Sequence, residues 1–120
     1  MSLESDDQLI LLHNPRCSKS RAARALFEER GVAFTERRYL EEPLSLAELE
    51  QLSVRLGRSP HEWVRKGEDA YREAGLDSDA TADRVLEAMA AHPILIERPI
   101  AMRGDRAVVG RPPEEVLSLL

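Results

Sequence analysis

Four consecutive large apolar residues, 9–12, constrain the fold of this chain more than any other feature of its sequence. An unbroken apolar run of this length is typical of a strand covered on both faces. Turn-forming residues follow, and Ser18 is a good N-cap for a helix that begins just after Cys17. An apolar face over residues 19–30 predicts this helix, and the alternation over residues 32–39 predicts a second strand. The opening third therefore predicts a βαβ unit with parallel strands.

The middle of the chain is predicted to be helical, because capping-box patterns at residues 45–48 and 59–62 each precede a helical stretch. Apolar residues on both sides of Gly104 then predict a hairpin, and residues 112–115 predict the start of a closing helix. The order βαβ, helical insertion, ββα resembles that of a thioredoxin-like α/β domain with a mixed four-stranded sheet flanked by helices. A small doubly wound domain is the alternative, but it accommodates the closing hairpin less well.

Length, charge and cysteine content exclude several classes of protein. We expect one domain over residues 8–120, preceded by a frayed acidic tail over residues 1–7. No apolar run is long enough for a membrane span, and the N-terminus lacks the features of a secretion signal. A net charge of -5 disfavours nucleic-acid binding. Because the single cysteine cannot form an internal disulfide, we expect a cytoplasmic protein. We also expect a monomer.

Cys17 is the candidate reactive group. It lies where a predicted strand ends and a predicted helix begins, and the free amides and dipole of a helix N-terminus stabilise an anion such as a thiolate. Arg16, Lys19 and Arg21 add positive potential, which lowers the pKa of a cysteine below its usual value of about 8.5. The alternative is a buried, inert cysteine. The polar loop around Cys17 makes burial unexpected.

Ser20 occupies the position where dithiol thioredoxins carry the second cysteine of their C-x-x-C motif. An adduct on Cys17 must then be resolved by an external thiol, because the chain has no other cysteine. The Ser20 hydroxyl either donates to the thiolate or simply caps the helix. Asn14 is expected to order the loop through side-chain hydrogen bonds to the backbone. The spacing of the three histidines and one cysteine indicates no metal site.

Four segments resemble, in order, the signature blocks of the glutaredoxin-dependent arsenate reductase (ArsC-type) family. They are HNPRCSKSR at residues 13–21, YLEEP at 39–43, HPILIERPI at 92–100 and GRPPE at 110–114. In that family a cysteine attacks arsenate, glutathione displaces the arsenic adduct, and glutaredoxin recycles the thiol while arsenite leaves. The resemblance implies an oxidoreductase with Cys17 as nucleophile, glutathione as co-substrate, glutaredoxin as partner and no tightly bound cofactor.

The resemblance also implies roles for the residues around the cysteine. The family holds the oxyanion with three arginines, which correspond to Arg65, Arg98 and Arg111. Guanidinium groups suit this task because they bind tetrahedral oxyanions bidentately, although arginine is common here and each could be an ordinary surface residue. Pro99 resembles the cis-proline that faces the active cysteine in thioredoxin-like folds. His13 corresponds to a family histidine thought to tune the site, or is a structural residue of the loop.

The substrate loop departs from the family at residues 18 and 19. Arsenate reductases often carry Gly and Thr there, whereas Ser18 and Lys19 resemble a shorter branch of the family. Lys19 either strengthens oxyanion binding or blocks it. Two other functions stay open. A redox-linked regulator of the Spx type binds RNA polymerase and needs the C-x-x-C pair that Ser20 removes. A monothiol glutathione-exchange protein would need the cysteine but not the arginines.

Overall fold

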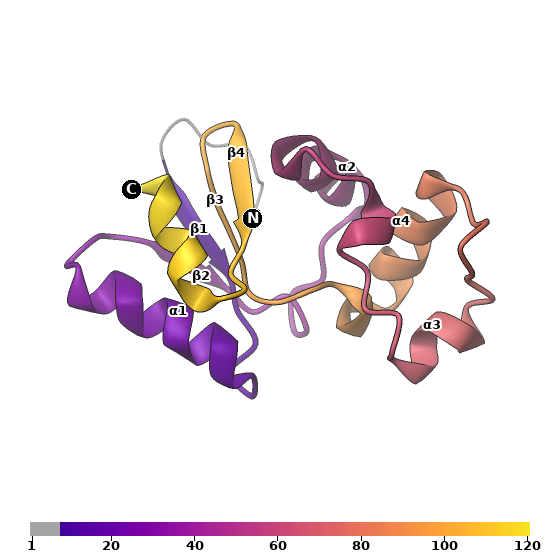
Figure 1. Cartoon of the computed structure of the whole chain (residues 1–120), viewed down its shortest axis with the longest axis horizontal. Helices are drawn as coiled ribbons and strands as arrows, with labels where there is room; N and C mark the ends of the chain where they lie inside the picture. Colours follow the sequence, from indigo (N-terminus) through magenta and orange to yellow (C-terminus); the bar gives the residue numbers. More distant parts are fainter. Residues whose placement is uncertain (1–7) are drawn as a thin grey trace.

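The computed structural model describes residues 8–120, so the tail predicted for residues 1–7 lies outside the described part. The strands are β1 (Leu9–Leu12), β2 (Thr35–Arg37), β3 (Ile100–Arg103) and β4 (Arg106–Val109). They form one mixed four-stranded sheet in the order β2-β1-β3-β4 (Figure 1). β1 is parallel to β2 and antiparallel to β3, and β3 and β4 form the predicted hairpin.

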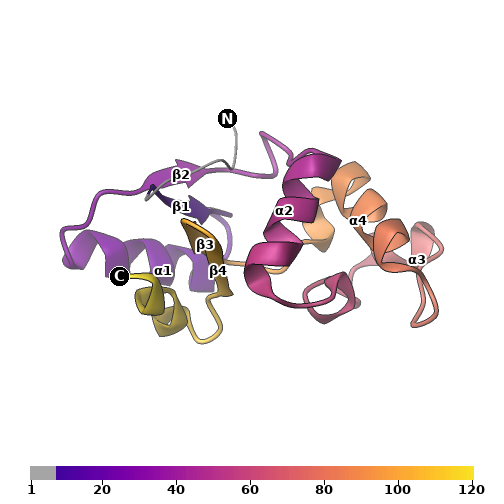
Figure 2. The same cartoon turned by 90° about the horizontal axis from the view of Figure 1, so that it is seen from above.

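Helices cover both faces of this sheet. α1 (Ser18–Glu29) and a closing 3₁₀ helix (Pro113–Leu119) bury one apolar cluster on one face. α2 (Leu46–Leu56) and α4 (Ala82–Ala91) bury a larger cluster on the other. With the short α3 (Asp69–Glu73), they form a helical lobe beside the sheet (Figures 1 and 2). This arrangement confirms the predicted fold class, and no helix described in residues 8–120 is long and apolar enough to span a bilayer.

Strand β2 is shorter than the predicted strand, residues 32–39. Only its three residues pair with β1. Val32 and Phe34 pack into the cluster under α1, where the rings of Phe27 and Phe34 lie 5.3 Å apart. Tyr39 lies beyond the end of β2 and is buried in the cluster on the other face. The alternation in the sequence thus reflects burial on the two faces, which continues past both ends of the paired strand.

The register of the two central strands defines one functional edge of the sheet. Leu12, the last residue of β1, pairs with Ile100, the first residue of β3. Because these strands are antiparallel, the loop after β1 and the segment before β3 emerge at the same edge. Cys17 lies on the first of these connections, and Arg98 lies on the second. The sheet therefore brings together two segments that are distant in the sequence.

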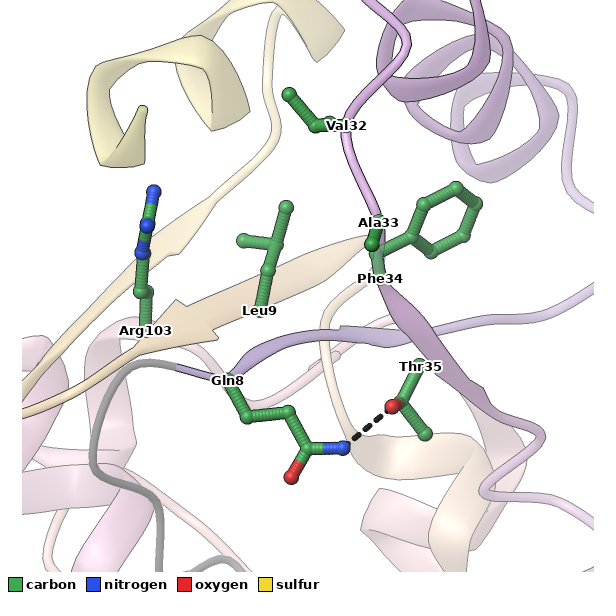
Figure 3. Close-up of a pocket in the computed structure, with 7 residues that line it drawn as sticks. All are labelled: Gln8, Leu9, Val32, Ala33, Phe34, Thr35 and Arg103. Carbon is green, nitrogen blue, oxygen red and sulfur yellow. Dashed lines mark hydrogen bonds between the residues drawn. The ribbon is translucent and has the colours of Figure 1, made fainter.

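A surface pocket lies at the opposite edge of the sheet, where β1 and β2 begin. It is lined by Gln8, Leu9, Val32, Ala33, Phe34, Thr35 and Arg103 (Figure 3). The side-chain amide of Gln8 donates a hydrogen bond to the hydroxyl of Thr35 across this end. Among residues 8–120, no cysteine, histidine or carboxylate lines this pocket. Cys17 and His13 both follow β1 and so lie at the other edge of the sheet.

A buried ion pair connects β2 to the helical lobe. The Arg37 guanidinium contacts both carboxylate oxygens of Glu48, at 2.6 and 3.1 Å. Its Nε donates to the Glu42 carbonyl at 3.1 Å, and its Nη2 donates to the Pro43 carbonyl at 2.8 Å. Arg37 is 5% exposed, and its own carbonyl accepts the N–H of His13 at 2.8 Å. The Arg37 side chain therefore fixes the segment that follows β2, and the Arg37 carbonyl connects β2 to the loop before the cysteine.

We expect Arg37→Ala to lower the free energy of unfolding by about 3 kcal/mol, because it leaves the Glu48 carboxylate without its buried partner. Urea denaturation monitored by Trp63 fluorescence measures the change. Arg38→Ala is the matched control, because Arg38 is exposed and its ion pair with Glu36 lies at the surface, so it should leave the free energy of unfolding nearly unchanged. Equal losses in the two variants would contradict this role for Arg37.

Candidate active site

Cys17 is the N-cap of α1, and Ser18, the predicted N-cap, is the first helical residue. The Cys17 backbone is extended, with φ -96° and ψ 124°, and its carbonyl accepts the N–H of Arg21 at 3.0 Å. A tight turn precedes it, since the Cys17 N–H donates to the Asn14 carbonyl at 3.0 Å. The Cys17 sulfur is placed beside the free amides of the first helical turn.

The thiol of Cys17 is buried, at 9% exposure, so the expectation of an exposed cysteine is wrong. Burial by itself raises the pKa of this thiol. The backbone N–H of Ser20, the side chain of Arg98 and the backbone N–H of Lys19 all hydrogen-bond the thiolate and outweigh burial, so the pKa lies below its ordinary value. The neighbouring residues 15, 16, 18 and 19 are exposed, whereas Cys17 is buried beside these donors.

Arg98 is the side chain that reaches the cysteine from the other connection. Its charged side chain lowers the pKa of Cys17, and two of its buried nitrogens, Nε and Nη1, have no hydrogen-bond partner among the described residues. The Arg98–Pro99 peptide bond is cis. Gly110 packs directly against this turn, and its N–H donates to the Pro99 carbonyl at 2.8 Å. A Cβ at position 110 would lie only 2.8 Å from Pro99 Cγ, so a side chain there would clash with the proline ring. Unsatisfied buried donors beside a thiolate form a site suited to an anion.

His13 and Ser20 form a buried pair beneath the loop. His13 Nδ1 lies 2.7 Å from Ser20 Oγ, and Ser20 Oγ accepts the N–H of Asn14 at 3.0 Å. The Ser20 hydroxyl therefore binds the loop, and it is the Ser20 backbone N–H that bonds the thiolate. Burial lowers the pKa of His13, opposed by Glu36, so the ring is neutral at pH 7. This pair supports the loop from below.

Two further contacts order the outer part of the loop. The Asn14 carboxamide oxygen accepts the N–H of Arg16 at 3.0 Å. The Arg21 guanidinium donates to the Pro15 carbonyl at 2.9 Å, so that α1 supports the loop that precedes it. Arg21 is therefore placed as a support of the loop. The Lys19 side chain is exposed at the start of the helix, and only its backbone N–H bonds the sulfur.

Tyr39 is a site residue that sequence reasoning missed. It is 1% exposed and shares a side-chain hydrogen bond with Asn14. Burial raises the pKa of its hydroxyl to about 12, although the charge of Arg98 and the bond to Asn14 oppose this, while the charge of Cys17 adds to it. The phenol is therefore a neutral group beside the thiolate. Its place in the YLEEP block after a parallel strand was the available signal.

Arg65 and Arg111 lie on either side of a carboxylate that sequence reasoning also missed, Glu97. Its Oε1 is 3.1 Å from Arg111 Nε and 4.0 Å from Arg65 Nε. Arg111 Nε also donates to the Arg98 carbonyl at 2.9 Å, whereas Arg65 is paired mainly with Glu68, at 2.6 Å. The structure thus brings the three arginines to one neighbourhood. Only Arg98 is in contact with Cys17.

We expect Arg98→Ala to raise the pKa of Cys17, because it removes both a hydrogen bond and a positive charge from the thiolate. The thiolate absorbance at 240 nm, followed against pH, measures the midpoint. It should lie below the ordinary cysteine value in the unaltered protein and move to higher pH in the variant. Arg106→Ala, an exposed arginine on β4, should leave the midpoint unchanged. An unshifted midpoint in Arg98→Ala would exclude this contact.

Comparison with known proteins agrees with the fold. Residues 12–119 match the model of the ArsC family. An arsenate reductase of Neisseria meningitidis is 44% identical over 94% of this chain and 98% of its own length. An arsenate reductase of Haemophilus influenzae is 39% identical over 93% and 98%. The structure of an arsenate reductase from Vibrio cholerae superposes with a TM-score of 0.90 at 42% identity, covering 97% and 100% of the two chains. The protein belongs to the ArsC family.

Proposed function

We propose that this protein reduces arsenate to arsenite, with Cys17 as the nucleophile. The observation that carries the proposal is the pair of buried Arg98 nitrogens without a partner, directly beside a thiolate of lowered pKa. A tetrahedral oxyanion would satisfy these donors and bring its central atom to the sulfur. The names of the relatives favour arsenate among such oxyanions.

The first step joins sulfur to arsenic. The Cys17 thiolate attacks As(V), one arsenic–oxygen bond breaks, and that oxygen leaves as water after protonation. Arg98, together with Arg65 and Arg111, stabilises the negative charge on the remaining oxygens. The product is a thioester-like adduct in which Cys17 Sγ is bound to arsenic. The neutral His13 and Tyr39 hold the loop without adding negative charge that would repel the anion.

An external thiol completes the reduction, and we propose glutathione for this step. Its thiolate attacks Cys17 Sγ, the sulfur–arsenic bond breaks, and the electron pair of that bond stays on arsenic, which leaves as arsenite. Cys17 and glutathione are then joined in a mixed disulfide, which a glutaredoxin reduces. In sum, one arsenate and two thiols give one arsenite, one disulfide and one water. The single cysteine of the chain favours this route, and its thiol chemistry requires a reducing compartment such as the cytoplasm.

We expect arsenate-dependent NADPH oxidation in an assay that contains glutathione, glutaredoxin and glutathione reductase. Cys17→Ser should abolish it, because no sulfur–arsenic bond can form. Arg98→Ala should lower kcat/KM for arsenate by about 100-fold or more, since it removes a charged donor from the oxyanion and from the thiolate. Arg106→Ala is the control for loss of an arginine elsewhere. Turnover that survives in Cys17→Ser would refute the assignment of the nucleophile.

Arginine variants also distinguish arsenate reduction from simple glutathione exchange. A monothiol exchange protein would reduce a glutathionylated peptide through Cys17 and would tolerate Arg111→Ala. A reductase should lose arsenate turnover in Arg111→Ala. The expected result is therefore loss of arsenate turnover in both arginine variants, Arg98→Ala and Arg111→Ala. Full activity on the peptide with none on arsenate in the unaltered protein would favour exchange instead.

A further inference from the structure

Glu97 is held in a fixed position between two neighbouring elements. Its backbone N–H donates to the Trp63 carbonyl at 3.0 Å, next to the bridge between Val64 and Ile96. Its Oε1 accepts the N–H of Arg98 at 3.0 Å. The side chain is 26% exposed. The carboxylate is therefore attached to the backbone just before the residue that reaches Cys17, and it cannot swing freely into solvent.

This fixed carboxylate meets Arg111 at one end of its guanidinium group. Glu97 Oε1 is 3.1 Å from Arg111 Nε, and the same Nε donates to the Arg98 carbonyl at 2.9 Å. The single Nε–H proton is donated to the Arg98 carbonyl, and Glu97 forms an ion pair with the same nitrogen. The two terminal nitrogens, Nη1 and Nη2, have no hydrogen bond or ion pair within residues 8–120. The arrangement fixes the guanidinium plane and leaves free the pair of donors that binds an oxyanion bidentately.

Arg65 forms its ion pair through a different nitrogen from Arg111. Its Nη1 is paired with Glu68 at 2.6 Å, and Glu97 Oε1 lies 4.0 Å from its Nε. Glu68 therefore neutralises this arginine through a terminal nitrogen, whereas Glu97 leaves the terminal nitrogens of Arg111 free. Glu68 thus occupies a terminal nitrogen that could bind a ligand, and Glu97 does not. Contact geometry singles out Glu97 as the one that prepares an arginine for binding.

From these contacts we infer that Glu97 is a positioning residue. By accepting the Arg98 N–H and pairing with Arg111 Nε, it holds Arg111 against the Arg98 carbonyl and leaves the terminal nitrogens of Arg111 available to the oxyanion. The inference rests on the proposed function, because it deepens the role of Arg111 in that same site. Pre-ordering a long side chain reduces the entropy lost when the ligand binds. A negative charge placed only to neutralise the arginines would instead weaken binding of an anion. The two roles predict opposite effects of removing the carboxylate.

The first experiment tests the contact without any ligand. The Nε–Hε signal of Arg111 in a ¹H–¹⁵N NMR spectrum is assigned by its absence in Arg111→Lys. We expect its exchange with water to quicken several-fold in Glu97→Ala. The Nε–Hε bond to the Arg98 carbonyl then loses both the ion pair on Nε and the contact that fixes the Arg98 backbone. Glu115→Ala is the control, because Glu115 lines the same surface pocket as Glu97 and Arg111. It should leave the exchange rate unchanged. An unchanged rate in Glu97→Ala would overturn the inference.

The second experiment measures arsenate binding by calorimetry, with every variant made in the full-length Cys17→Ser protein. Glu97→Ala should raise the Kd on the order of ten-fold, the size expected for one contact between charged groups. Glu97→Gln keeps an oxygen at the same position and should stay within about three-fold of the parent. Glu115→Ala should not raise the Kd. In an Arg111→Ala background, Glu97→Ala should not raise the Kd further, because contacting residues are not additive.

A fall in Kd on Glu97→Ala would overturn the inference, because it would show that the carboxylate only repels the anion. An equal rise in Kd with and without Arg111 would overturn it as well, because Glu97 would then act through another group. If the Cys17→Ser parent binds no arsenate while its Arg111 Nε–Hε signal is protected, the proposed function fails, and the role of Glu97 in oxyanion binding fails with it. Additive effects on a parent that does bind arsenate refute only the inference.

Discussion

The pairing of Leu12 with Ile100 is the interaction on which the rest of the structure depends. It sets the end of β1 against the start of β3, so that the two flanking connections face each other across one edge of the sheet. One connection supplies the thiol and the first turn of α1, and the other supplies Arg98. Apolar clusters on both faces fix this pairing, since a shift by one residue would turn the buried side chains of β1 to the wrong faces.

The chemistry of the site arises from charge balance at this edge. Burial works against a thiolate at Cys17, and only donors from both connections reverse its effect on the pKa. The groups packed around the sulfur are arranged so that they add no competing negative charge. His13 is neutral, and Tyr39 keeps its proton. Glu97, the carboxylate that contacts both Arg65 and Arg111, accepts the Arg98 N–H and pairs with Arg111 Nε. The structure thus keeps positive charge available for an anionic ligand.

Local patterns predicted much of the fold but little of the site's inner contacts. The apolar run before Cys17, the capping boxes at residues 45–48 and 59–62, and the hairpin at Gly104 were correct because each depends on neighbours in the chain. The burial of Cys17, the partner of the Ser20 hydroxyl and the contacts of Glu97 depend on how β1 packs against β3. Sequence spacing carries no information on that packing. Motif resemblance identified Arg98 as a site residue, but not the atoms that it leaves unpaired.

The most direct test is the mass of the protein after incubation with arsenate and glutathione in the absence of glutaredoxin. The proposed reaction predicts that one glutathione becomes attached, that peptide mapping places it on Cys17, and that dithiothreitol removes it. It also predicts that attachment requires arsenate and releases one arsenite for each adduct. Attachment of glutathione at the same rate without arsenate, or arsenite release without any adduct on Cys17, would contradict the account.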